Sequence, residues 1–320
     1  MNSNVSSQTD NVLAAANEVL KKKGRSFHWA RRLLNAQHAA RATRLYYLCR
    51  YLDDLADEAT CVEHSKTILN EIKYSIQSGH STTPVICDGL LLIDECKINP
   101  RFLCELIDGV GSDLHHVAIA DMDGLLRYCY QVAGTVGLMM CSVLDVKDPK
   151  ALPHAVDLGI AMQLTNICRD VRDDALAGRR YLPASMLGEL TTNDLVDPCI
   201  EIQPQLQQCL RTLLEIAESY YRSGELGLSY LPLGARAGIL TAARLYRAIG
   251  TGIKNRHHRY WQGRVVVTPI EKATLTARAL LSVPAVRSFW QPTEQHDSSL
   301  HRPLEAFNFV AHIKNQLHGV

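Results

Sequence analysis

The chain has 320 residues and a mass of 35.6 kDa, which is long for one domain but compatible with a single large core. Apolar residues make up 47% of the sequence and charged residues 21%, a balance typical of a folded globular protein and not of a disordered one. The formal net charge of +1 at pH 7 gives no electrostatic basis for nucleic-acid binding, so we expect no nucleic-acid partner.

Neither a membrane span nor a secretory signal is evident. The longest uncharged run, residues 128–144, includes two glycines and is shorter than the about 20 apolar residues that a spanning helix needs. The first ten residues are polar and lack an apolar core. Ten cysteines are scattered without any CxxC pair, and we interpret them as buried thiols in a reducing cytoplasm.

Helices are the only regular elements that the pattern predicts. Proline is absent from residues 1–83, 101–148, 154–182, 205–231 and 233–268, and each stretch is long enough for one or more helices. Strand-like alternation is nearly missing, and the short run Val265 to Val267 could equally end a helix. We expect one all-α domain of about eight to ten helices. Its predicted parts are a polar tail (1–14), a main helical domain (15–290) and a C-terminal tail (291–320) that could include a last helix.

The first concentration of acidic side chains lies in residues 46–58, YYLCRYLDDLADE. On a helix, four polar side chains share a wedge of about 60° over three turns: Tyr46, Arg50, Asp53 and Asp57. Two carboxylates at i and i+4 repel each other unless a cation compensates them, and Mg²⁺ with phosphate oxygens suits that role. Arg50 is placed to hold a phosphate oxygen. A solvated acidic face remains the alternative interpretation.

The second concentration is residues 163–183, QLTNICRDVRDDALAGRRYLP. Gln163, Asn166, Asp170 and Asp174 form a polar stripe on the predicted helix. An apolar stripe lies directly beside it: Ile160, Leu164, Ile167, Val171 and Ala175. We therefore expect a polar floor in an apolar cavity, and two acidic stripes without histidine or cysteine at ligand spacing favour Mg²⁺ over zinc. Arg169 and Arg172 could instead pair with the neighbouring acids, and one of Arg179 and Arg180 could serve only the helix dipole.

These segments, together with residues 128–137 (YCYQVAGTVG), resemble the phytoene/squalene synthase family of head-to-head trans-prenyltransferases. Gly24 to Phe27 looks like the N-terminal substrate-contact segment of the family, and a weaker match runs from Tyr246 to Arg264. The resemblance covers roughly residues 15–290 and is strongest to bacterial phytoene synthases. It implies an isoprenoid-synthase-type bundle of helices around a large central cavity.

The resemblance also implies roles for individual residues. Catalytic roles are expected for Asp53, Asp57, Asp170, Asp174, Tyr128 and Arg50. Bound Mg²⁺, or Mn²⁺ in its place, is expected on Asp53, Asp57, Asn166, Asp170 and Asp174. Substrate contacts are expected from Ser26, Phe27, Tyr46, Val132, Ala133, Gly137, Gln163, Asn166, Arg169, Tyr181, Tyr246 and Arg264. The small residues Ala133, Gly134 and Gly137 fit either an isoprenoid tail or a closely packed helix.

The expected reaction joins two geranylgeranyl diphosphates 1–1′ into phytoene for carotenoid biosynthesis. It passes through a cyclopropylcarbinyl diphosphate, releases two diphosphates and needs no NADPH. One alternative is a C15 enzyme that converts farnesyl diphosphate into dehydrosqualene, presqualene diphosphate or squalene. Alternatives of other classes are a non-catalytic helical scaffold and a metal-stabilised lipid-binding module.

The expected location is the cytoplasm, with peripheral membrane contact and a downstream desaturase as a partner. The basic residues Lys254 to Arg259 could meet the lipid or form only a solvated face. A last helix from Leu304 to Leu317 could cover the core or contact the membrane.

Overall fold

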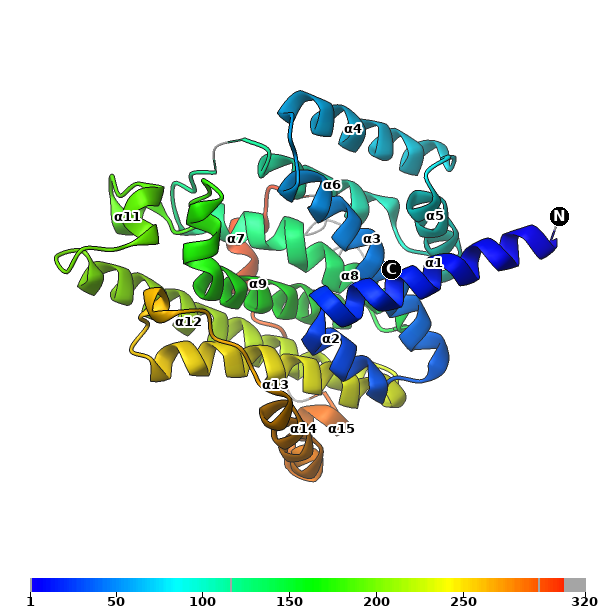
Figure 1. The fold of residues 1–320 in the computed structure, drawn as a ribbon. Helices are drawn as coiled ribbons and strands as arrows, with labels where there is room; N and C mark the ends of the chain where they lie inside the picture. Colours follow the sequence, from blue (N-terminus) through cyan, green and yellow to red (C-terminus); the bar gives the residue numbers. More distant parts are fainter. Residues whose placement is uncertain (1, 116, 293, 308–320) are drawn as a thin grey trace.

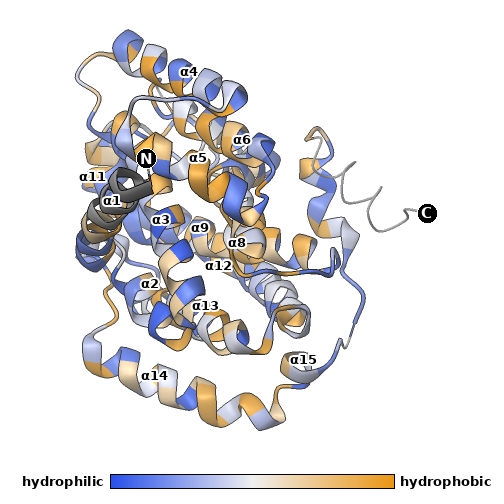
Figure 2. Cartoon of the chain, turned by 90° about the vertical axis from the view of Figure 1, so that its right-hand side faces the viewer, coloured by the Kyte–Doolittle hydropathy of each residue, from blue (hydrophilic) through white to orange (hydrophobic). Residues whose placement is uncertain are grey.

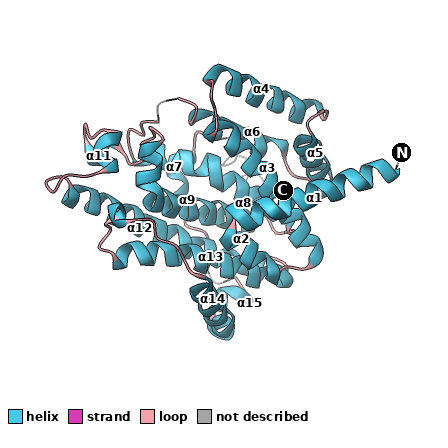
Figure 3. Ribbon diagram, viewed as in Figure 1, coloured by secondary structure: helices cyan, strands magenta, loops and turns pink. Residues whose placement is uncertain are grey.

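The computed structural model describes residues 2–115, 117–292 and 294–307 of the chain. Throughout these residues the regular elements are helices and no strand occurs (Figure 3). The only β-type pairing in the described part is an isolated bridge between Ala118 and Arg180. The predicted all-α fold is therefore confirmed.

Eleven helices of the described part have eight residues or more. They are α1 (Asn2–Lys23), α3 (Ala36–Asp57), α4 (Val62–Ser78), α5 (Pro84–Cys96), α6 (Pro100–Ser112), α7 (Met122–Cys129), α8 (Thr135–Val143), α9 (Ala151–Leu176), α12 (Gln203–Leu226), α13 (Leu233–Asn255) and α14 (Pro269–Ser282). Shorter helices are α2 (Arg25–Ala30), α10 (Ala184–Leu187), α11 (Thr192–Val196) and α15 (Arg287–Trp290). The expected eight to ten helices undercount this set, because short helices have too few turns to show a periodic pattern.

Local signals in the sequence explain several helix ends. The Asn35 side chain accepts a hydrogen bond from the His38 amide at 2.8 Å and caps α3. Thr268 and Glu271 form a reciprocal capping box at the start of α14. Gly79 ends α4 at φ 72°, a left-handed conformation that favours glycine. Of the two helices that carry acidic segments, α3 is therefore capped by a side chain, whereas α9 begins without a side-chain cap.

Helix α9 is the central element of the fold (Figure 1). It packs against α8, α12 and α13, and its apolar stripe is buried, with Ile160 and Leu164 fully inaccessible. Helices α4 and α14 lie at opposite edges of the molecule in two perpendicular views (Figures 1 and 2). Within the described residues, no helix combines the length and the apolar character that crossing a bilayer requires.

Helix α9 lies very close to α8 and to the preceding π-helical turn η2 (Tyr130–Gly134), and glycines make this close packing possible. A Cβ on Gly137 would lie 2.2 Å from the Ala155 carbonyl oxygen, and one on Gly159 would lie 2.3 Å from the Ala133 oxygen. Both neighbours are backbone atoms, which cannot move aside cheaply. Close helix packing, one of the two interpretations of this small-residue segment, is therefore present.

Several expectations change in detail. Residues 2–14, expected as a polar tail, belong to helix α1. Val265 to Val267 neither end a helix nor form a strand, because they lie in an extended strap, residues 263–268, between η4 (Tyr260–Gln262) and α14. All ten cysteines are free thiols, but Cys61 and Cys199 are exposed and not buried as expected.

The C-terminal segment folds back onto the core. A 3₁₀ helix, η6 (Ser298–Leu304), is buried at Leu304. The predicted last helix from Leu304 to Leu317 lies, beyond residue 307, outside the described residues.

Candidate active site

Two connected compartments occupy the middle of the bundle. The polar compartment, of about 760 Å³, opens between α3, α9 and the strap, and the apolar compartment, of about 290 Å³, continues inward between α3, α8, α9 and α13. Eight residues line both compartments and mark the junction: Phe27, Tyr46, Cys49, Asp53, Val132, Gln163, Asn166 and Tyr246. The cavity therefore joins a charged region to an apolar one, as a substrate with one polar and one apolar end requires.

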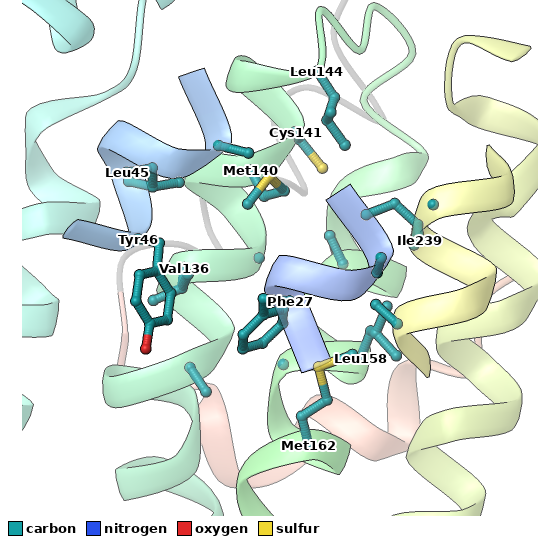
Figure 4. Close-up of a pocket in the computed structure, with 18 of the residues that line it drawn as sticks. Phe27, Leu45, Tyr46, Val136, Met140, Cys141, Leu144, Leu158, Met162 and Ile239 are labelled. Atoms are coloured by element: carbon teal, nitrogen blue, oxygen red, sulfur yellow. The ribbon is translucent and has the colours of Figure 1, made fainter. Parts of the chain in front are cut away.

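The walls of the apolar compartment come mainly from long aliphatic and small side chains (Figure 4). On α9 these are Ala155, Leu158, Gly159 and Met162. From the apolar stripe predicted beside the acidic residues, Ile160 and Leu164 pack in the core, whereas Ile167 lines the polar compartment. Periodicity identified the buried side of α9 but not which part of that side faces the cavity.

The last two turns of α3 carry the first acidic group. Arg50 forms ion pairs with both Asp54 and Asp57. Arg179 from the loop after α9 donates to Asp57 and, at 3.2 Å, to the Ala56 carbonyl oxygen. Asp53 makes no hydrogen bond or ion pair with any other described residue. Burial, with further repulsion from Asp57, raises the pKa of Asp53 to about 7.

The C-terminal half of α9 carries the second acidic group. Asp170 accepts hydrogen bonds from the guanidinium groups of Arg169, at 2.8 Å from Nε, and Arg264, at 2.7 Å from Nε. Asp174 has no such partner in the described part of the chain. Burial and the neighbouring Asp170 raise the pKa of Asp174 to about 8.

The two acidic groups face the same compartment from different helices and share one property. In each, one carboxylate is neutralised by arginine (Asp57 and Asp170) and one is left without a cation (Asp53 and Asp174). Buried carboxylates that lack an ion-pair partner, as Asp53 and Asp174 do among the described residues, are suited to binding a cation. The solvated-face interpretation therefore fails for both segments.

Two buried polar atoms beside these acids also lack partners. Arg50 Nε, a donor, and Asn166 Oδ1, an acceptor, make no hydrogen bond, while Asn166 Nδ2 donates to Gln163 Oε1 at 3.3 Å. An unsatisfied buried donor or acceptor costs about 1–3 kcal/mol, so a ligand that hydrogen-bonds to both atoms would remove this cost. A carboxylate-rich set with one amide oxygen fits a hard divalent cation such as Mg²⁺, and the arginine donor fits a phosphate oxygen.

A third carboxylate, Asp113 at the end of α6, binds two tyrosines at the edge of the polar compartment. It accepts hydrogen bonds from Tyr128 Oη at 2.8 Å and Tyr181 Oη at 2.9 Å, and the two rings stack with centroids 4.9 Å apart. Burial raises the pKa of Asp113 to about 6, although both phenol hydrogen bonds act to lower it. Asp113 therefore fixes the orientation of both phenols.

Three aromatic rings stand where the two compartments meet. The Phe27 ring lies 6.0 Å from the Tyr46 ring and 5.0 Å from the Tyr246 ring. Burial raises the pKa of Tyr246 to about 12, so its phenol is neutral. The faces of such rings attract cations, which makes this junction suitable for stabilising positive charge away from water.

All eighteen predicted site residues line one compartment or both. They are Ser26, Phe27, Tyr46, Arg50, Asp53, Asp57, Tyr128, Val132, Ala133, Gly137, Gln163, Asn166, Arg169, Asp170, Asp174, Tyr181, Tyr246 and Arg264. Their location makes the predicted contacts feasible, and their individual roles remain predictions.

Sequence reasoning missed several residues of the polar compartment: Lys23, Arg25, Asp113, Arg179 and Lys272. Arg25 and Arg179 carried a sequence signal, because Arg25 lies in the segment Gly24 to Phe27 and Arg179 lies in residues 163–183. Its neighbour Arg180 instead donates to the Leu190 carbonyl oxygen, so only one of this arginine pair reaches the acidic groups.

Comparisons with known proteins agree with this geometry. Among solved structures, a dehydrosqualene synthase in complex with ligand has a TM-score of 0.78 at 24% identity, covering 87% of this chain and 99% of that one. A squalene synthase from Alicyclobacillus acidocaldarius has a TM-score of 0.69 at 18% identity, covering 78% of this chain and 95% of that one. At these identities the likeness establishes the fold.

Sequence relatives extend the comparison. A protein of Pantoea ananas named 15-cis-phytoene synthase is 32% identical, over 88% of this chain and 97% of that protein. One of the same name from Enterobacter agglomerans is 34% identical, over 83% of this chain and 97% of that protein. Residues 20–271 match the squalene/phytoene synthase family as a whole. The chain therefore belongs to the squalene/phytoene synthase family.

Proposed function

We propose that the protein is a prenyltransferase that joins two molecules of geranylgeranyl diphosphate head to head into phytoene. The observation that carries this proposal is the convergence of four carboxylates, Asp53 and Asp57 from α3 and Asp170 and Asp174 from α9, at the mouth of an apolar compartment. Relatives named 15-cis-phytoene synthase, at 32% and 34% identity, support the C20 substrate.

The two compartments divide the substrate between them. The diphosphate groups lie in the polar compartment, where Arg50 Nε is an unpartnered donor and where Lys272 and Arg25 add positive charge. The isoprenoid tails enter the apolar compartment, whose small residues leave room for chains. Most side chains there are apolar and offer water no hydrogen bond, which disfavours its entry.

Magnesium, with manganese as a substitute, would be held by Asp53, Asp57, Asn166, Asp170 and Asp174. When bound, the ions neutralise the negative charge that builds up on the departing diphosphate. Arg179 and Arg264, which contact Asp57 and Asp170, lie where their guanidinium groups can bind diphosphate oxygens as well.

The reaction proceeds in two ionisations. The C1–O bond of one substrate breaks, the C2=C3 double bond of the other attacks that carbon, and loss of a proton leaves a cyclopropylcarbinyl diphosphate. The second C–O bond then breaks, the skeleton rearranges to a 1–1′ linkage, and a second proton leaves. Two diphosphates and two protons are released, and because no hydride is taken up, NADPH is not required. The rings of Phe27, Tyr46 and Tyr246 stabilise the intermediate cations.

The test is incubation of purified protein with Mg²⁺ and geranylgeranyl diphosphate, and separately with farnesyl diphosphate, without NADPH. Extracted hydrocarbons are analysed by mass, and released diphosphate is measured. We expect a C40 product from the C20 substrate and none from the Asp170→Ala variant. Arg172→Ala is the matched control on the same helix, because Arg172 is exposed and donates only to the Val196 carbonyl oxygen.

Other outcomes of this experiment would favour one of the alternative functions. A product from farnesyl diphosphate alone would keep the mechanism but move the protein to the C15-using branch. Absence of both hydrocarbon and diphosphate release would favour the scaffold, and metal binding without turnover would favour a lipid-binding module.

We also propose a cytoplasmic protein that contacts a membrane surface and passes its product to a desaturase. Phytoene has no polar group, so release into lipid is favoured over release into water. Lys254, Arg256 and Arg259 are exposed at the end of α13 and would meet anionic headgroups, whereas His258 of the same cluster is buried. Sedimentation with anionic but not with neutral vesicles is the expected result, weakened by Lys254→Glu.

A further inference from the structure

A second group of metal-ligand side chains lies away from the acidic pairs. Asp157, near the start of α9, meets His296 and His301 from the C-terminal segment. Asp157 and Asp170 are thirteen positions apart on one helix, which corresponds to about 20 Å along its axis. This cluster therefore belongs to a different part of the molecule from the proposed diphosphate site.

The cluster is buried and its donor atoms converge. His296 Nε2 lies 2.8 Å from Asp157 Oδ2, and His301 Nε2 lies 2.7 Å from Asp157 Oδ1. The two imidazole rings have centroids 4.5 Å apart. The Asp157 side chain has no solvent exposure, and those of His296 and His301 are 12% and 10% exposed.

Charge balance requires a positive partner for Asp157. The Asp157 side chain is fully inaccessible, and its two carboxylate oxygens face His296 Nε2 and His301 Nε2. No lysine or arginine of the described residues forms an ion pair with it. An inaccessible carboxylate is costly without a compensating charge, which must come from an imidazolium or from a metal ion.

The geometry points to a zinc site formed by Asp157, His296 and His301. Each histidine presents Nε2 to a different oxygen of one carboxylate, so two nitrogens and two oxygens lie close together. One ligand atom from each of the three residues lies within 4.8 Å of the others, and a bound zinc would draw them in to distances of about 2.0–2.2 Å from the ion. Two imidazoles and a carboxylate suit Zn²⁺ and not Mg²⁺, which prefers oxygen.

Surrounding residues hold these ligands in place. Ser223 Oγ on α12 donates to Asp157 Oδ2, and the Ser223 carbonyl oxygen lies 2.7 Å from His154 Nδ1. The His154 ring in turn stands edge-on to the His296 ring at 5.1 Å. Such outer contacts fix the orientation of ligating side chains.

A bound ion would fasten the C-terminal segment to the inner end of the cavity. His154 lines the apolar compartment, and Tyr220 Oη donates to the Leu300 carbonyl oxygen at 2.7 Å between the two ligating histidines of the segment. Zinc would thus stabilise the wall against which the substrate tails lie, and it would take no part in ionising the diphosphate.

The test measures zinc content and stability. Untagged protein is stripped with a chelator, reloaded with Zn²⁺ in the presence of excess Mg²⁺ and desalted, and zinc per chain is measured by mass spectrometry. We expect one zinc per chain, a thermal midpoint that rises with Zn²⁺ concentration, and visible absorption bands when Co²⁺ replaces zinc. His301→Gln should lower zinc affinity at least about 100-fold.

Two controls locate the ion. The double variant Asp170→Asn/Asp174→Asn should keep its zinc, because its change lies at the acidic groups. His80→Gln, which alters an exposed histidine, should also keep it. The proposal would be overturned if the double variant lost its zinc while His301→Gln retained it. It would also be overturned if the unmodified protein bound no stoichiometric zinc, and Asp157, His296 and His301 would then be only a hydrogen-bonded cluster. If His301→Gln does not fold, the unmodified protein and the double variant decide the question.

Discussion

The polar and apolar compartments of one cavity are built on different principles. In the polar compartment, side-chain charge is arranged so that some carboxylates are neutralised and others are not, as Asp170 and Asp174 illustrate. In the apolar compartment, the absence of side-chain volume is what matters, as Gly137 and Gly159 illustrate. Substitutions in the first should therefore act through charge at nearly constant shape, and those in the second through shape at constant charge.

Asp170→Asn should have the largest effect, because it removes a charge and preserves the shape. We expect turnover to fall at least about 10³-fold, since metal and arginine contacts to the departing diphosphate depend on this carboxylate. Diphosphate release and hydrocarbon formation are the measurements, with the thermal midpoint as a check on folding. Activity above a tenth of the unmodified level would contradict the assigned role.

Gly159→Ala should act on shape alone. The added Cβ would lie 2.3 Å from the Ala133 carbonyl oxygen, so α9 must separate from η2, with an expected loss of about 1–3 kcal/mol in the free energy of unfolding. Urea denaturation provides the measurement. Gly234→Ala on α13 is the matched control, because its Cβ meets nothing within 4 Å and should leave stability unchanged or slightly higher. Equal effects of the two variants would show that close packing is not the cause.

Met140→Trp should change chain-length preference. Met140 lines the apolar compartment and does not reach the polar one, so the larger ring takes space from the tail and leaves the acidic groups intact. The ratio of kcat/KM for farnesyl diphosphate to that for geranylgeranyl diphosphate should rise about tenfold, or about 1.4 kcal/mol. Met140→Leu, of similar volume, should leave the ratio unchanged. A loss of both activities in equal proportion would instead indicate general damage.

Arg264→Lys should have the smallest effect, because it keeps the charge and removes only the planar fork. Arg264 is 52% exposed on the strap and contacts Asp170 through two nitrogens. We expect a fall in kcat/KM of roughly 3-fold to 10-fold, in line with the modest strength of exposed ion pairs. A fall in kcat/KM as large as that caused by Asp170→Asn would show that the contact from Arg264 matters as much as the carboxylate of Asp170 itself.

The sequence by itself determined the fold class and the composition of each helix face. Proline spacing and the lack of strand alternation predicted an all-α chain, and helical periodicity placed Asp53 with Asp57 and Asp170 with Asp174. This succeeds because a helix fixes the angle between its own residues regardless of what packs against it.

Only the tertiary structure decided which faces meet. It brought Asp113 and Lys272 to the polar compartment and set Leu158 and Met162, not Ile160 and Leu164, along the cavity. It also placed His296 and His301 on Asp157, across 139 and 144 positions of sequence. Periodicity describes one helix at a time, whereas contacts between distant segments depend on how side-chain volumes and charges fit together in the packed core.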